Sequence, residues 1–236
     1  MSDGRAESPQ TLIIDADDTL WENNIYFEQA WEDFVQFLDH SHLPAERIRA
    51  IFDEIEMANI EIHGYGARNF ARNMVQCYEH LVERAIAPGD ADHILSLADR
   101  IFHQPIEMLP GVEDTLGYLL HRSHDLILFT KGHPEEQRLK IDRSPVGRFF
   151  REFEIVREKD AGAYRELARR HQLVPSITWM IGNSPKSDIN PALAAGLNAV
   201  FVPHPRTWSL ERTELAPAGP GTLRIVENFS DLRNFF

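Results

Sequence analysis

Five short apolar runs, each followed by polar or glycine positions, recur along the chain. They cover residues 11–14, 125–129, 153–156, 177–181 and 199–202. Each run is apolar on both alternating faces, which is typical of a strand buried on both sides of a parallel sheet. Helical patterns lie between the runs, at 112–123, 134–142, 161–172 and 191–195. This alternation predicts an α/β fold with a doubly wound, Rossmann-like parallel sheet as its core.

The end of the chain carries further local signals. The helix expected at 191–195 has Asn190 as a candidate N-cap, and Gly196 stands just past its end. Residues 223–226 are expected to form a short edge strand, and residues 231–236 a last helical turn.

One long segment, between Leu20 and Pro110, interrupts the alternation. Four sets of apolar residues recur there at helical spacing, and each set marks one face of an amphipathic helix. The sets are Phe27, Trp31, Phe34 and Leu38; Ile48, Ile51, Ile55 and Ala58; Phe70, Met74, Cys77 and Leu81; and Ile94, Ala98 and Ile101. A block of about 90 residues is far longer than a normal α/β connection. We therefore expect an all-helical cap domain at 21–110, inserted into an α/β core domain formed by 1–20 and 111–236.

Polar groups at the ends of the expected strands carry the candidate chemistry. They are Asp15 and Asp17 after the first strand, Thr130 and Lys131 after the second, and Lys159, Asn183 and Asp188 after the later strands. Ligands of open α/β sheets bind beyond the carboxyl ends of the strands, so we expect these groups to converge. Clustered carboxylates repel one another unless a hard cation such as Mg²⁺ lies among them. A hydroxyl and a lysine would hold phosphoryl oxygens, and a carboxylate can attack phosphorus to form an aspartyl phosphate.

Four motifs occur in a fixed order among these residues, and with them the sequence resembles the haloacid dehalogenase (HAD) superfamily of phosphohydrolases. Residues 13–20 match the first motif, an apolar strand followed by Asp-x-Asp-x-Thr. The second motif is a strand ending in Ser or Thr, here Thr130, and the third is a lysine that opens a helix, here Lys159. The fourth is Gly-Asp with a second Asp five residues later, and residues 182–188 match it except at Asn183.

The resemblance implies a role for each matching residue. Asp15 would be the nucleophile and a metal ligand, and Asp17 would be the general acid/base, with its backbone carbonyl also on the metal. Thr130 and Lys159 would bind and neutralise the phosphoryl group, and Asp188 would hold Mg²⁺. Asp17 also argues against the dehalogenase branch, which resembles the phosphatases but lacks an acid at this position.

Asn183 is the departure from the pattern, which usually has Asp there. A neutral amide can still hydrogen-bond a metal-bound water, so we keep Asn183 as a candidate metal residue and expect weaker Mg²⁺ binding. The alternative is that Asn183 shapes the turn without touching the metal.

Residues beyond the motifs are weaker candidates for contact with substrate. Lys131 would assist Thr130 and Lys159 with the phosphoryl group, and both Lys131 and Lys186 compete with Lys159 for its role. Trp21 follows the first motif closely and is expected to face the mouth of the site. Arg68 would reach an anionic group from a turn between cap helices, although an ordinary interhelical loop is the favoured interpretation.

Composition narrows the class of partner. With 24 Lys and Arg against 37 Asp and Glu, the net charge of −13 argues against binding to nucleic acid or to an anionic membrane. A single cysteine, Cys77, excludes an intramolecular disulfide framework and a Cys-based zinc site, which fits a reducing compartment. Residues 1–10 have neither the basic start nor the apolar stretch of a signal peptide, so we expect a cytoplasmic protein. The oligomeric state stays open.

These observations lead to one functional hypothesis with two alternatives. The hypothesis is a Mg²⁺-dependent phosphomonoester hydrolase that acts on a small phosphorylated metabolite through an aspartyl phosphate. The insertion after the first strand resembles the helical cap type, which usually goes with small soluble substrates. The alternatives are a phosphomutase and a non-catalytic HAD-like binding protein whose metal site is weakened by Asn183.

Overall fold

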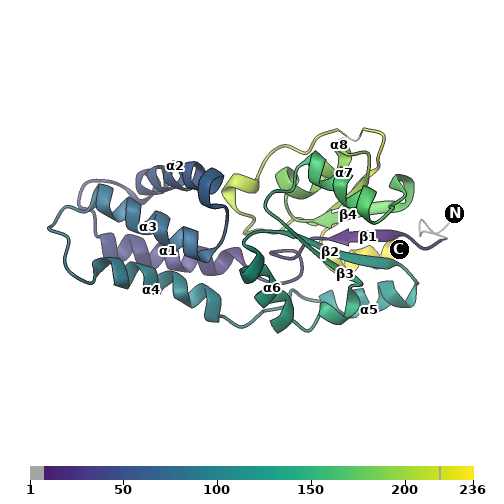
Figure 1. The fold of residues 1–236 in the computed structure, drawn as a ribbon, viewed down its shortest axis with the longest axis horizontal. Helices are drawn as coiled ribbons and strands as arrows, with labels where there is room; N and C mark the ends of the chain where they lie inside the picture. Colours follow the sequence, from purple (N-terminus) through teal and green to yellow (C-terminus); the bar gives the residue numbers. More distant parts are fainter. Residues whose placement is uncertain (1–7, 218) are drawn as a thin grey trace. The chain divides into compact units, whose positions relative to one another are not determined.

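A parallel β-sheet forms the centre of the α/β part of the protein (Figure 1). The computed structural model describes residues 8–217 and 219–236, so most of the N-terminal stretch considered for a signal peptide lies outside the described residues. In this described part, the sheet has six strands in the order β3-β2-β1-β4-β5-β6, and every neighbouring pair is parallel. The strands are β1 (Thr11–Ile14), β2 (Asp125–Lys131), β3 (Glu152–Val156), β4 (Thr178–Gly182), β5 (Asn198–Phe201) and β6 (Leu223–Ile225). The predicted doubly wound α/β fold class is confirmed.

Helices cover both faces of the sheet, above and below it in Figure 1. Leu12 and Ile14 of β1 pack on one face with helical elements α5 (Val112–His121), α6 (Pro134–Arg143) and η5 (Phe229–Asn234). Ile13 packs on the other face with α7 (Ala161–Arg170) and α8 (Asn190–Ala194). Alternate side chains of a strand point to opposite faces, so an entirely apolar strand needs both layers. Short turns complete this part: η1 (Gly147–Phe149), η2 (Pro175–Ile177), η3 (Pro185–Ile189) and η4 (Ser209–Glu211).

The beginning of α8 differs from the prediction. Asn190 is the first residue of α8 and not its N-cap, because its side chain bonds to the backbone of Glu214 and Ala216. A π-helical turn, η3, precedes the helix, and Ser184 caps it by accepting a hydrogen bond from the N–H of Ser187. The sequence pattern does not reveal this turn, since π-type hydrogen bonding has no short periodic signature.

Residues 25–105 are all described and contain no strand. They form α1 (Asn24–Leu38, which begins one residue earlier), α2 (Ala45–His63), α3 (Ala67–Leu81) and α4 (Asp90–His103). Aromatic rings fill the core of this helical unit, with Phe52 4.8 Å from Trp31 and 5.2 Å from Phe70 between ring centroids. The helical segment thus has a core of its own, as the four apolar sets indicate.

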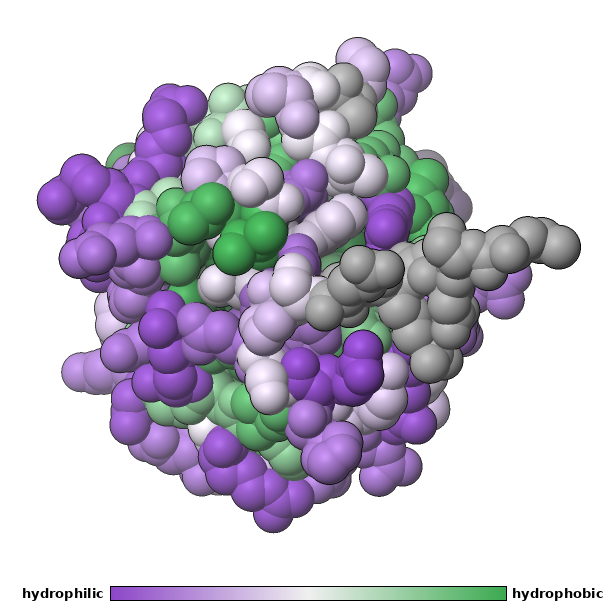
Figure 2. Space-filling model, turned by 90° about the vertical axis from the view of Figure 1, so that its right-hand side faces the viewer, coloured by the Kyte–Doolittle hydropathy of each residue, from purple (hydrophilic) through white to green (hydrophobic). Residues whose placement is uncertain are grey.

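Contacts divide the chain into two compact units. One is Ile25–Pro105, and the other comprises the residues up to Asn24 and from Ile106 on. The domain limits of 1–20 with 111–236 and of 21–110 stay a prediction. No helix among the described residues has both the length and the apolar character needed to cross a membrane. The face shown in Figure 2 is mixed, with hydrophilic residues around smaller apolar areas, which is normal for a protein surface.

Glu56 on α2 is a buried acid that makes the stability of the helical unit depend on pH. Burial is the main cause that raises its pKa from 4.5 to about 8, although Arg49 acts in the opposite direction. Because the folded pKa lies above the unfolded one, stability present below about pH 4.5 is lost as the pH rises towards about 8. We expect Glu56→Gln to remove much of this slope, an effect of up to a few kcal/mol.

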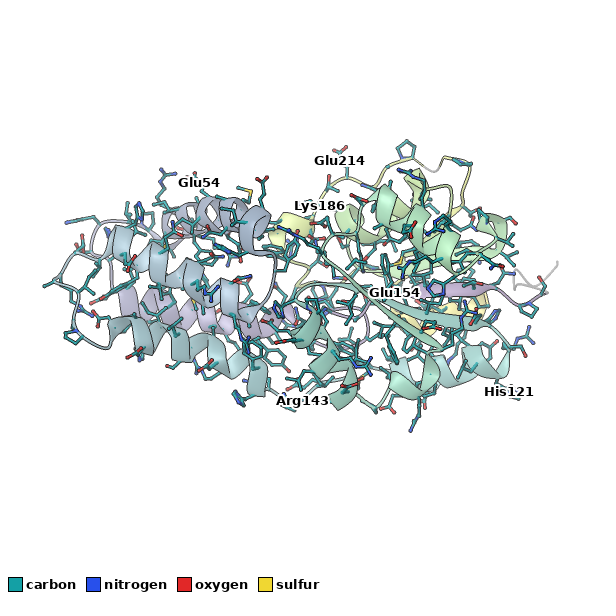
Figure 3. All side chains as sticks on the ribbon, viewed as in Figure 1. Glu54, His121, Arg143, Glu154, Lys186 and Glu214 are labelled. Carbon is teal, nitrogen blue, oxygen red and sulfur yellow. The ribbon has the colours of Figure 1, made fainter. Side chains whose placement is uncertain are left out.

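Thermal unfolding followed by circular dichroism between about pH 5 and 8.5 measures this slope, with the range set by the raised pKa of Glu56. Glu54→Gln is the matched control, since Glu54 lies on the same helix, is exposed and projects outwards in Figure 3. Equal slopes for Glu56→Gln and the unmodified protein would contradict the assignment.

Candidate active site

The parallel register brings the ends of β1, β2 and β4 together. Ile14, the last residue of β1, lies beside Leu128 of β2 and Ile181 of β4. The N–H of the next residue, Asp15, donates to the carbonyl of Ile181 at 2.9 Å. Asp15 therefore lies at the carboxyl edge of the sheet, and only 7% of its surface is exposed.

Lys159 joins the two carboxylates that the motifs single out. Its Nζ donates to Asp15 Oδ1 at 2.5 Å and to Asp188 Oδ1 at 2.8 Å, and Lys159 is only 2% exposed. Burial alone would lower the pKa of Lys159, but Asp15 and Asp188 outweigh burial and raise it. Asp188 Oδ2 accepts the N–H of Ser184, and any Cβ at Gly182 would overlap the Asp188 carboxylate. Glycine at the end of β4 thus makes room for Asp188.

Asp15 and Asp188 share this single ammonium, so one positive charge faces two carboxylates. The pKa of Asp15 is raised to about 7, first by burial and then by the charge of Asp188, although Lys159 opposes the shift. Two carboxylates in a buried site are stable together when a further cation balances them. The available ligands are oxygen atoms, which Mg²⁺ prefers. The residues present therefore fit a magnesium ion at this edge.

Asn183 is part of a hydrogen-bonded loop beside Asp15. The Thr19 hydroxyl lies 3.0 Å from Asp15 Oδ2 and 3.1 Å from Asn183 Oδ1. The Asn183 side-chain amide donates to the hydroxyl of Thr207 at 3.0 Å. These contacts connect the loop after β4 to the first motif, as expected if Asn183 shapes the turn. A role for Asn183 in metal binding stays a prediction.

Asp17 makes a separate set of hydrogen bonds. Both of its oxygens lie 2.6 Å from Lys140 Nζ, which also donates to Asn23 Oδ1. Trp21 Nε1 donates to Asp17 Oδ1 at 2.8 Å, and Gln137 Nε2 donates to Oδ2 at 2.9 Å. The side chain of Asp17 is thus held by three donors, none of which also binds Asp15.

Gln137 connects Asp17 to the second motif. Its Nε2 lies 2.6 Å from the hydroxyl of Thr130, which is 1% exposed at the end of β2. Gln137 and Lys140 both belong to α6 and are three residues apart, so they lie on the same face of the helix. Sequence reasoning missed both residues, because nothing in the sequence distinguishes them from the other polar residues of this helix.

The three lysines considered for the third motif have different partners. Lys159 is the one that reaches Asp15. Lys131 Nζ instead bonds to Glu211 at 2.6 Å and to the Ser187 hydroxyl at 2.8 Å, while Lys186, labelled in Figure 3, donates to the carbonyl of Leu210. Lys131 already has an acidic partner, which it would have to share with a phosphoryl group. Its expected contact with the phosphoryl group stays a prediction.

Comparison with known proteins identifies the family. A family model described as haloacid dehalogenase-like hydrolase matches residues 9–196. The chain belongs to the haloacid dehalogenase-like hydrolases. A search of curated protein sequences gave no match.

Solved structures share the HAD-like fold over nearly the whole chain. A haloacid dehalogenase-like family hydrolase from Xanthomonas campestris has 27% identity and a TM-score of 0.80, with 96% of this chain and 91% of that chain covered. A predicted phosphoglycolate phosphatase from Haemophilus somnus 129PT has 14% identity and a TM-score of 0.65, with coverage of 95% and 96%. An L-2-haloacid dehalogenase from Xanthobacter autotrophicus has 12% identity and a TM-score of 0.64, with coverage of 95% and 96%. At such identities the last two show the fold alone.

Trp21 and Arg68, the weaker candidates for contact with substrate, lie in different parts of this HAD-like hydrolase. Trp21 is 1% exposed and packs in the main apolar core, and its contact with substrate stays a prediction. Burial of the large indole ring of Trp21 stabilises the fold, and its N–H donates to Asp17. Arg68 lies on α3 of the helical unit, where its guanidinium is 5.6 Å from the centre of the Phe102 ring. Its contact with substrate stays a prediction.

Proposed function

We propose that this HAD-like hydrolase is a Mg²⁺-dependent phosphomonoester hydrolase that acts on a small phosphorylated metabolite. The observation that carries the proposal is the buried group formed by Asp15, Lys159 and Asp188. Asp17, two residues after Asp15, is held beside this group by Lys140. One carboxylate is available to attack, a second completes a cation site, and a third is available for proton transfer. The family model supports a hydrolase. The similar solved structures include one described as a phosphatase and one described as a dehalogenase.

The first step would form an aspartyl phosphate. Asp15 attacks the phosphorus of the ester, a new oxygen–phosphorus bond forms, and the bond to the leaving alkoxide breaks. Asp17 gives its proton to that alkoxide, and for this its pair with Lys140 has to open. Thr130 and Lys159 bind the phosphoryl oxygens, so that charge developing in the transition state meets fixed donors. Asp15, Asp188 and the backbone carbonyl of Asp17 would hold Mg²⁺, which supplies positive charge to the phosphoryl oxygens.

The second step would release inorganic phosphate. Asp17, now ionised, accepts a proton from water as the water oxygen attacks the same phosphorus. The oxygen–phosphorus bond to Asp15 breaks, and the carboxylate is restored. Uncatalysed hydrolysis of phosphate monoesters is among the slowest biological reactions, with accelerations by enzymes of up to ~10²¹. A positioned nucleophile, a positioned acid and concentrated positive charge are the means by which such a barrier is lowered.

The charge of the chain supports a small soluble substrate. A net charge of −13 disfavours nucleic acid and anionic membranes as partners, because both need clustered Lys and Arg. The single cysteine, Cys77, is buried and unpaired, which supports a reducing compartment such as the cytoplasm.

Assays with two substrates test the reaction class. With Mg²⁺ present, we expect phosphate release from p-nitrophenyl phosphate and no halide release from 2-chloropropionate. A chelator should stop the first reaction and added Mg²⁺ should restore it, because two carboxylates around one ammonium need the further cation. Asp17→Asn should also lose activity, since an amide does not carry the proton, and a decrease of 10²-fold or more is expected, within the ~10²–10⁴ contribution of acid–base catalysis.

The opposite pattern would reject the proposal. Halide release without phosphate release would identify a dehalogenase. Transfer of the phosphoryl group within a sugar phosphate, with no free phosphate, would identify a phosphomutase. Absence of turnover together with Mg²⁺ affinity far weaker than cellular levels would identify a binding protein.

A further inference from the structure

Three side chains beside the first motif form a cluster that the proposed reaction does not use. They are Asp18 and Glu22, from the segment after Asp17, and His204, from the loop after β5. One ligand atom from each of the three lies within 4.8 Å of the others. The cluster lies wholly in the α/β unit, so all three residues have fixed positions relative to one another.

His204 points a buried, unpartnered nitrogen into this cluster. Its side chain is 8% exposed, and its Nδ1 has no hydrogen-bond partner but lies 3.9 Å from Asp18 Oδ1. The other ring nitrogen, Nε2, lies 3.5 Å from Glu22 Oε2, which is also buried without a hydrogen-bond partner. Buried polar atoms normally have a partner, and leaving one unsatisfied costs about 1–3 kcal/mol. An ion bound among these side chains would give His204 Nδ1 the partner that it lacks.

The cluster also has spare capacity to bind a cation. Asp18 accepts only neutral backbone N–H groups, from Asn23 at 2.8 Å and from Asn24 at 3.1 Å to Oδ1 and 3.2 Å to Oδ2. A carboxylate oxygen has two acceptor sites, so Oδ2 keeps one for another donor or a metal. Besides His204, Glu22 has Arg206 as a charged partner, whose Nη1 lies 3.4 Å from Oε1 and whose side chain is 46% exposed. An exposed pair of this length balances little of the charge of two carboxylates.

We propose that Asp18, Glu22 and His204 bind a divalent transition-metal ion, and that Zn²⁺ is the ion they fit. One imidazole nitrogen with two carboxylate oxygens suits zinc, whereas Mg²⁺ prefers oxygen ligands alone. Tetrahedral zinc with bonds of about 2.0 Å spaces its ligand atoms about 3.3 Å apart. The separation of 3.9 Å is measured from His204 Nδ1 and that of 3.5 Å from Nε2, and one ion binds only one of these nitrogens. One ligand atom from each residue lies within 4.8 Å of the others, so the three side chains have to move closer together when the ion binds.

This site is separate from the one at which Asp15 and Asp188 meet. Asp15 bonds to Lys159 and Thr19, whereas Asp18 bonds to Asn23 and Asn24. An ion on Asp18, Glu22 and His204 would join the segment after the first motif to the loop after β5, and so have a structural role.

The loop after β5 in turn supports the candidate active site. The N–H of Thr207 donates to the carbonyl of His204 at 3.1 Å, and the Thr207 hydroxyl accepts from Asn183. Fixing His204 would therefore also fix the loop that holds Asn183 next to Asp15.

Metal-binding stoichiometry tests this proposal without reference to activity. The full-length protein is stripped with a chelator and dialysed against Zn²⁺, and bound zinc is measured by elemental analysis. We expect His204→Gln and Glu22→Gln each to lose one equivalent or to weaken its binding at least about 10-fold. Asp188→Asn should keep this equivalent, because it changes only the neighbouring magnesium site.

His171→Gln is the matched control. His171 Nε2 lies 2.6 Å from Glu154 Oε1, and both side chains are 15% exposed, so the variant removes a similar His–Glu pair elsewhere in the same unit. Glu154 is labelled in Figure 3. This control should bind zinc as the unmodified protein does.

Three results would overturn the proposal. They are no zinc binding by the unmodified protein, unchanged binding by His204→Gln, and loss of the same equivalent in Asp188→Asn. Far-UV circular dichroism shows whether each variant is folded. If His204→Gln and Glu22→Gln both fail to fold, Co²⁺ added to the unmodified protein decides: a visible absorption band that Zn²⁺ displaces but Mg²⁺ does not supports the site, and the absence of a band rejects it.

Discussion

Replacing Asp15 with asparagine is expected to abolish hydrolysis of an aryl phosphate, with kcat lowered by at least about 10⁴-fold, as for other removed nucleophiles. The amide has nearly the same shape, and its oxygen can still accept from Lys159 at the position of Oδ1. It has no charge with which to attack phosphorus. The loss therefore reflects the missing nucleophile rather than a missing contact.

The stability of Asp15→Asn separates these two causes. The pKa of Asp15 is raised to about 7, mainly by burial, so in the absence of metal the ionised carboxylate costs stability as the pH rises from about 4 through about 7. The amide does not titrate, and the variant should unfold at an equal or higher temperature than the unmodified protein at about pH 8. Asp114→Asn, an exposed change in the first turn of α5, should leave activity unchanged and lower stability by no more than about 1 kcal/mol.

Mass spectrometry after rapid acid quench supplies a second readout. The unmodified protein should gain one phosphoryl group on the peptide that contains Asp15, and Asp15→Asn should gain none. Comparable turnover by Asp15→Asn, or a phosphoryl group on another residue, would show that Asp15 is not the nucleophile.

Lys159→Met is expected to lower both activity and stability, because it leaves two buried carboxylates without their cation. Breaking a buried ion pair by removing one partner typically costs about 3–5 kcal/mol, and Lys159 is only 2% exposed. Activity should fall at least about 10²-fold, since a donor to the transition state is removed as well. The stability loss should shrink as the pH is lowered below about 7, because Asp15 then takes up a proton.

Denaturant unfolding at about pH 5 and pH 8, on either side of the raised pKa of Asp15, measures this effect. Lys186→Met is the control, because Lys186 bonds to a backbone carbonyl and not to a carboxylate. Added Mg²⁺ should restore part of the stability of Lys159→Met by supplying positive charge between Asp15 and Asp188. Equal stability of Lys159→Met and Lys186→Met would contradict the pairing that the structure shows.

Much of the fold could be predicted from the sequence, because burial on both faces of the sheet leaves a direct record in apolar runs. The positions of Asp15 and Asp188 follow from this, since residues just after parallel strands must meet at one edge. Burial did not decide among Lys159, Lys131 and Lys186, and Lys159 was assigned only through its match to the third motif. All three lie near that edge, and which one reaches Asp15 depends on side-chain directions that spacing does not encode. Lys131 instead pairs with Glu211, 80 residues away.

The partners of Asp17 were the least predictable part of the candidate site. Lys140 is 123 residues from Asp17, and nothing in its neighbourhood on a strongly charged helix distinguishes it from a solvated surface lysine. Trp21 follows the first motif closely, but the sequence does not reveal that its side chain is buried and donates to Asp17. Asn190 likewise has the residue type of an N-cap but bonds to a distant loop instead. For Lys140 and Asn190, a partner far away in the sequence decided between roles that the local sequence allows equally.

The interruption of the α/β unit by the helical unit has a consequence for protein synthesis. Lys159 follows Asp15 by 144 residues, and Asn183 follows Thr19 by 164. At a translation rate of about 5–20 residues per second, roughly 7–30 s pass before the ribosome has added the lysine that neutralises Asp15. During that time β2 is completed, but β4, the other neighbour of β1, is not, whereas the helices of Ile25–Pro105 depend on contacts within their own segment. We therefore expect the helical unit to form on the nascent chain before the sheet around β1 is complete.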